Sequence, residues 1–204
     1  MKEAIQSAEG QVREYAPMTM TVELYTENEP HPHRQEAFFV RAQFPWQREP
    51  LTRVMVEITR SEILLLPPEL RPIIHEYGEP MQPLINVYSL EEIIIEKLRA
   101  ILQHTKKLHE RDWGRSRARD YYDLWSIFRI FGSRLELDGA SHLLKQKCAH
   151  REVSFSDASA FFNEKILDHV QRTWSQWLGP LVSELPSYDT VLSELRPKIE
   201  ALLS

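Results

Sequence analysis

Two expected helices carry charged side chains whose types and spacing could do chemistry. Ser89, with Glu92 three positions later, forms a capping box that predicts the start of a helix. Lys97 lies beside the apolar stripe of that helix, and such a lysine keeps its charge when an anion is close by. Asp120 and Asp123 share one face of the next helix, because helical residues three apart are neighbours.

Positive charge is concentrated in the same stretch. From Lys97 to Arg119 there are eight lysines and arginines against two acids, Glu110 and Asp112, although the chain has a formal net charge of −5. A local excess of positive charge attracts anions even on an acidic protein. The simplest chemistry that suits this arrangement is the binding of a phosphate-bearing ligand.

Two motifs in this stretch resemble a known family. Glu-Lys-Leu-Arg-Ala at 96–100 and Arg-Ala-Arg-Asp-Tyr-Tyr-Asp-Leu-Trp at 117–125 are similar to the later signature motifs of the AbiEii/AbiGii toxin family. These toxins are nucleotidyltransferases of the polymerase-β-like superfamily, found in type IV toxin–antitoxin and phage-abortive systems. Looser similarity at 56–62, 174–178 and 185–191 extends the resemblance over most of the chain from about Phe38.

The resemblance implies transfer of a nucleotide from an NTP to an acceptor such as RNA, with Mg²⁺ as the metal and an antitoxin as partner. Two divalent ions held by three carboxylates allow an electron-rich triphosphate and an attacking oxygen to approach each other. The implied catalytic residues are Glu57, Lys97 and Asp120, with Glu57 on the metal. The implied nucleotide-binding residues are Lys97, Arg99, Arg117, Arg119 and Asp123.

The residues also allow simpler interpretations. In a strand over 53–60, Glu57 projects from the face opposite Val54, Val56 and Ile58, where it could be an ordinary solvated charge. Lys97 could extend from the helix edge into water. The two aspartates could serve the helix dipole in its first turn, or pair with neighbouring arginines. An aspartate that fixes a lysine or arginine would shape a pocket without touching a metal.

One feature of the family pattern is absent. None of the seven aspartates forms Asp-x-Asp, so the Gly-Ser motif and its metal-binding pair are expected to precede Met1. The chain is then a fragment, a mis-started reading frame or a natural truncation without catalysis, and could bind no cofactor by itself. The alternative function is a non-catalytic module that binds nucleic acid or a protein through the basic 97–119 surface. Gly132 to Asp138 echoes the motif but is predicted to be a turn between helices.

The predicted fold class is α+β, with an incomplete nucleotidyltransferase sheet at 1–88 packed on a helical domain at 89–204. Period-2 alternation predicts an antiparallel meander of three strands, near 18–24, 38–44 and 53–60. Prolines at 67, 68 and 80 are expected to interrupt any regular element before residue 89. The predicted helices are 2–15, 89–106, 118–131, 139–148, 156–178 and 188–203, and Pro197 should bend or break the last one.

Composition indicates the cellular compartment expected for the protein. A single cysteine, Cys148, fits a reducing cytosol, and no apolar run reaches the ~18 residues of a membrane span. A cytoplasmic protein that does not engage a membrane is expected. His31, His33, His104 and His109 have no partners at zinc spacing and are expected to be solvated.

Overall fold

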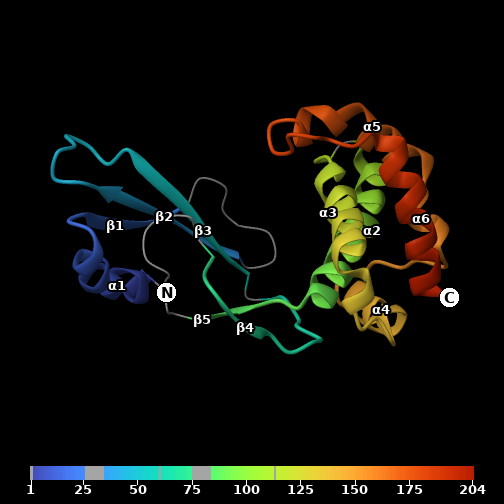
Figure 1. Ribbon diagram of the computed structural model, residues 1–204, viewed down its shortest axis with the longest axis horizontal. Helices are drawn as coiled ribbons and strands as arrows, with labels where there is room; N and C mark the ends of the chain where they lie inside the picture. Colours follow the sequence, from blue (N-terminus) through green and yellow to red (C-terminus); the bar gives the residue numbers. More distant parts are fainter. Residues whose placement is uncertain (1, 26–34, 60, 75–83, 113) are drawn as a thin grey trace. The chain divides into compact units, whose positions relative to one another are not determined.

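The computed structural model describes residues 2–25, 35–59, 61–74, 84–112 and 114–204 (Figure 1). The chain divides into two compact units, Met1–Glu62 and Ile63–Ser204, called here the N-terminal and C-terminal units. The described residues combine α-helices with small antiparallel sheets, which confirms the predicted α+β class. The division into 1–88 and 89–204 remains a prediction about functional parts.

The N-terminal unit is a helix followed by a three-stranded antiparallel meander, as predicted. The sheet order is β1-β2-β3, with neighbouring strands antiparallel. Helix α1 packs against β1. The elements are α1 (Lys2–Tyr15), β1 (Thr19–Leu24), β2 (Gln35–Gln43) and β3 (Thr52–Thr59).

The register of this sheet aligns the apolar side chains of the three strands on one face. Val22 lies opposite Val40, which lies opposite Val54, and Phe38 lies opposite Val56. A slip of one residue would turn every one of these side chains to the other face. Val22 and Phe38 are buried, whereas Val54 is 52% exposed, so the core of this unit is small.

The C-terminal unit is a helical bundle preceded by a short hairpin. Helices α2 and α3 lie side by side, and α3 also packs against α5 and α6 (Figure 1). The elements are β4 (Glu69–Pro72), β5 (Leu84–Val87), α2 (Leu90–Arg111), α3 (Ala118–Phe131), η2 (Gly132–Arg134), α4 (Ala140–His150), η3 (Ala158–Phe162), α5 (Glu164–Leu178) and α6 (Tyr188–Leu203). The predicted turn between helices at 132–138 is confirmed, because η2 and a short loop link α3 to α4.

The apolar stripe of α2 forms the centre of this bundle. Ile94, Leu98 and Ile101 are fully buried there, together with Leu124 of α3. The helix begins as predicted, because Ser89 is its N-cap and the Ser89 hydroxyl accepts a hydrogen bond from the Glu92 N–H, 3.1 Å away.

Two sequence-based predictions about elements are wrong, and a third is wrong in part. Strands β4 and β5 pair where no regular element was expected, because Pro67 and Pro68 precede β4 and Pro72 occupies its last position, where a proline is tolerated. The predicted helix 156–178 is two elements, because the Asn163 side chain accepts from the Lys165 N–H and caps a new helix. Of the expected bend or break at Pro197, the break does not occur: helix α6 continues through this residue, and one face of it is buried in the bundle.

The prediction that His104 is solvated is also wrong. Its side chain is 2% exposed and fills a site beside Gly114, in the loop that leads to α3. Burial, followed by the charge of Arg117, lowers the pKa of His104 to about 4, so the ring is neutral at pH 7. His109 is exposed as predicted, and His31 and His33 lie outside the described residues.

Gly114→Ala should destabilise the C-terminal unit. A Cβ at this position would lie 2.0 Å from the His104 Cε1, and the buried ring has little room to move. We expect a loss of about 1–3 kcal/mol in the free energy of unfolding, measured by urea titration. Gly132→Ala is the matched control, because its Cβ meets nothing within 4 Å. Equal stability of the two variants would contradict the close packing of His104 on Gly114.

Candidate functional site

Lys97 joins α2 to α3 through two carboxylates. Its Nζ donates to the Asp120 Oδ1 at 3.2 Å and to the Asp123 Oδ2 at 2.6 Å. The anion that a lysine beside an apolar stripe requires is therefore supplied by the chain itself. Burial alone lowers the pKa of Lys97, but the hydrogen bonds and charges of Asp123 and Asp120 outweigh it, so its pKa lies above the ordinary value.

Asp120 connects this lysine to an arginine. Its second oxygen, Oδ2, accepts from the Arg117 Nη1 at 3.0 Å, while Oδ1 accepts from Lys97. Each oxygen of the Asp120 carboxylate thus accepts a hydrogen bond from a different cation. The Ala118 N–H at the start of α3 is instead satisfied by the Ser116 hydroxyl, at 3.1 Å.

A cavity of about 350 Å³ opens beside this ion cluster, within the C-terminal unit. This volume is at the lower end of the range for small-molecule sites. Four of the residues predicted for the site line it together, namely Lys97, Arg99, Arg117 and Asp120, and Glu96 and Gln103 complete its polar wall. The structure therefore gathers these four predicted residues at one place.

The two arginines in this cavity each keep one donor without an acceptor. Arg99 is 8% exposed, and its terminal nitrogens donate to Glu96 and Gln103. The Nε atoms of Arg99 and of Arg117 are buried and find no hydrogen-bond partner among the described residues. Buried polar groups are nearly always hydrogen-bonded, so these two N–H groups call for an acceptor such as water or a ligand.

The other predicted binding residues lie at or beyond the edge of this cavity. Asp123 touches Lys97, and its side chain is 43% exposed. Arg119 lies over the ring of Trp177 on α5, with its guanidinium carbon 5.3 Å from the ring centroid. A cation stacked on an aromatic ring already has a favourable partner within its own unit.

The sequence analysis missed a buried lysine behind the cavity. Lys147 on α4 is 2% exposed, and its Nζ lies 2.6 Å from the Glu92 Oε1 and 3.2 Å from the Glu96 Oε2. Burial alone raises the pKa of Glu96, but Arg99 and Lys147 outweigh it and hold the pKa below its ordinary value. The available signal was helical spacing, because Lys147 shares the buried face of α4 with Leu144.

Glu57 stands apart from any carboxylate cluster among the described residues. It is exposed on β3, and its neighbour across the sheet is Ala37. In the described ranges, no three histidine, cysteine, aspartate or glutamate side chains gather to hold a metal ion. Asp120 and Asp123 face cations instead. These residues do not fit a two-metal site, and metal binding by Glu57 remains a prediction.

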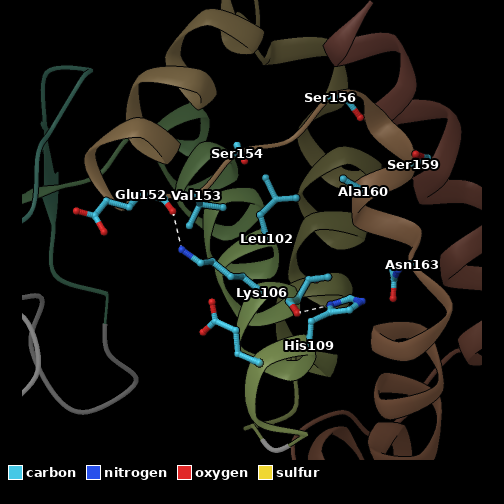
Figure 2. Close-up of a pocket in the computed structure, with 12 residues that line it drawn as sticks. Leu102, Lys106, His109, Glu152, Val153, Ser154, Ser156, Ser159, Ala160 and Asn163 are labelled. Carbon is cyan, nitrogen blue, oxygen red and sulfur yellow. Dashed lines mark hydrogen bonds between the residues drawn. The ribbon is translucent and has the colours of Figure 1, made fainter.

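A second cavity, of about 590 Å³, lies on another face of α2 (Figure 2). Lys106 points into this region and its Nζ donates to the Glu152 carbonyl oxygen at 3.0 Å, while His109 lies nearer to Asn163. Lys106 is nine residues from Lys97, or two and a half helical turns, so the two lysines face opposite ways. The basic residues of 97–119 therefore do not form one face.

Comparison of the chain with known families gives a match over nearly its whole length. A family model described as "Nucleotidyl transferase AbiEii toxin, Type IV TA system" matches residues 2–203. The chain belongs to the AbiEii family of nucleotidyl transferase toxins, as the motifs indicated, and the match includes the residues before Phe38.

The other comparisons add no relative. No curated protein and no solved structure matches the chain. Among the described residues, no helix is both long and apolar enough to cross a membrane. Cys148 is buried and free, and burial raises the pKa of its thiol to about 11.

Lys97 should stabilise the fold up to alkaline pH. Because its pKa in the folded chain is above the ordinary 10.5, its contribution is complete below that value and is lost as the pH rises through the folded pKa. The free energy of unfolding of the wild type should therefore fall more steeply above about pH 10.5 than that of Lys97→Met. Urea titrations over this range test it, with Lys198→Met on the exposed face of α6 as control. Parallel pH profiles for wild type and Lys97→Met would contradict the ion cluster.

Proposed function

We propose that the C-terminal unit holds the triphosphate of an NTP in the cavity beside Lys97. The observation that carries this proposal is the pair of buried, unpaired Nε–H groups of Arg99 and Arg117 at the same cavity. A buried donor without an acceptor costs about 1–3 kcal/mol, and phosphate oxygens would remove that cost. Guanidinium groups suit phosphate better than most donors because their N–H groups form a rigid fork.

The contacts support different roles for the three cations. Lys97 is neutralised by two carboxylates, so in this proposal it holds α2 and α3 together at the rim of the site. Asp120 orients Arg117, and Arg99 and Arg117 bind the phosphates. Three cations, Lys97, Arg99 and Arg117, meet three acids, Glu96, Asp120 and Asp123, so little net positive charge remains at the site. Binding should therefore be weak and sensitive to salt.

The reaction proposed for the protein is that of its family, the transfer of a nucleotide to an acceptor such as RNA, with a cognate antitoxin as partner. Mg²⁺ would neutralise the triphosphate in this reaction. We further propose that the 204-residue chain transfers no nucleotide by itself, because it contains no Asp-x-Asp and Glu57 alone cannot hold two metal ions. A cytoplasmic location is part of this proposal.

A second candidate function is a non-catalytic module that binds nucleic acid or a protein. Its support comes from the far end of α2, where Lys107 and Arg111 are exposed and Arg115 follows in the next loop. Burial, and then the charges of Arg117 and Arg111, lower the pKa of Lys107, so like charges gather there. This patch is smaller than the whole 97–119 surface, because Lys97, Arg99 and Arg117 are paired with acids.

Arg117→Gln should weaken the binding of ATP. The substitution removes the charge and the unpaired Nε–H, so we expect a loss of about tenfold or more in affinity by isothermal titration calorimetry. Arg115→Gln removes the same charge from an exposed position two residues away and should bind ATP like the wild type. An equal loss in both variants would indicate that ATP responds only to the general positive potential of this region, not to a specific site. A loss of RNA binding in Arg115→Gln alone would favour the second candidate function.

The chain alone should show no nucleotidyl transfer. Labelled NTPs, Mg²⁺ and total tRNA are incubated with the purified protein, and label in the RNA is measured. We expect none above background, since the chain has no Asp-x-Asp and no three carboxylates gather among its described residues. Robust transfer that Glu57→Gln abolishes would refute this proposal and establish Glu57 as a catalytic residue.

A further inference from the structure

We infer that Lys147, on a helix that does not line the cavity, is a positioning residue that sets Arg99 for phosphate through Glu96. This inference rests on the proposed function, because Arg99 matters here only if the cavity takes a phosphate. It assigns a role to a buried charge that neither the family motifs nor the ion cluster around Lys97 uses.

A continuous series of contacts runs from α4 to the cavity. The Lys147 Nζ lies 3.2 Å from the Glu96 Oε2, and the Glu96 Oε1 pairs with the Arg99 Nη2. The Arg99 Nη1 donates to Gln103, one helical turn further along α2. Both terminal nitrogens of Arg99 are therefore held by side chains of α2, and its buried Nε–H has no partner among the described residues.

Glu92 cannot take over the role of Glu96. Its carboxylate lies 2.6 Å from the Lys147 Nζ and also accepts from the backbone N–H groups of Leu65 and Leu66, at 3.4 Å and 3.2 Å. It holds the lysine and the start of the C-terminal unit in place. Glu96 touches both Lys147 and Arg99, so it links the buried lysine to the arginine, which Gln103 holds from its other terminal nitrogen.

This group combines charges of both signs. Lys147 and Arg99 supply two positive charges, and Glu92 and Glu96 supply two negative charges, all within the C-terminal unit. Without Lys147, Glu96 would be free to turn its whole carboxylate onto Arg99. The Glu96 carboxylate would then cover the guanidinium group that binds the phosphate, and its negative charge would repel the phosphate. Binding would weaken even though Lys147 itself never meets the ligand.

The variant Glu96→Gln separates positioning from simple electrostatics. It removes a negative charge next to Arg99, so electrostatics alone predicts tighter binding of an anion. Lys147 and Arg99 use different oxygens of Glu96, and the amide replaces one of these oxygens by an NH2 group that only donates, so one of the two contacts is lost. If positioning dominates, affinity falls, by about tenfold, which is the lower end of what removing an orienting partner costs a binding site. The two explanations predict opposite signs.

The experiment measures the affinity of inorganic triphosphate for the full chain by calorimetry, together with the melting temperature. Glu200→Gln, an exposed glutamate on α6, is the control with the same change of charge. Lys147→Met should weaken binding in the same direction as Glu96→Gln. Because a buried lysine variant can fail to fold, Glu96→Gln, whose side chain is already 27% exposed, carries the test by itself.

A second readout follows the arginine directly. Modification of Arg99 by an arginine-selective dicarbonyl reagent, mapped by peptide mass spectrometry, should be slow in the wild type and faster in Glu96→Gln at an unchanged melting temperature. Weaker triphosphate binding together with this faster modification supports the inference.

The outcomes distinguish the inference from the proposed function. Equal or tighter binding by Glu96→Gln, while the wild type binds and Arg117→Gln does not, overturns the positioning role and leaves the proposed function standing. A wild type that binds no triphosphate refutes the proposed function, and the inference with it.

Discussion

The pairing of α2 with α3 through Lys97 is the interaction on which the candidate site depends. An amphipathic helix can rotate by some degrees on an apolar neighbour without losing much buried area, because the hydrophobic effect is not directional. Hydrogen bonds from one Nζ to Asp120 and Asp123 remove that freedom. Since Asp120 also holds Arg117, the joint between the helices fixes the arginine at the cavity wall.

The cavity is therefore a polar site whose own acids already satisfy much of its positive charge. Lys97 is bound by two carboxylates, and the terminal nitrogens of Arg99 are held by Glu96 and Gln103. What remains for a ligand is a small set of fixed N–H groups with little net charge. Such a site favours a group that brings several acceptors in a compact shape, as a phosphate does. The site therefore orients a bound phosphate more than it attracts it by charge.

Local patterns in the sequence predicted much of this structure, and tertiary contacts account for the rest. Alternation set the register of the sheet around Val40, and the Ser89 cap set the start of α2, since both depend on residues close in the chain. The motif residues converged at one cavity because helical spacing fixes their faces. Lys147 was missed because the acids that make its burial tolerable come from another helix. His104 follows Ile101 on the buried stripe, so spacing could have revealed it.

The central claim is that Arg99 and Arg117 bind the phosphates of a nucleotide. The most direct measurement is a crystal structure of the chain with a non-hydrolysable ATP analogue. The account predicts phosphate oxygens within hydrogen-bonding distance of the Arg99 and Arg117 Nε atoms, with the Lys97 ion cluster still intact. An analogue bound in the second cavity, beside Lys106 and His109, with both Nε atoms still unpaired, would contradict it.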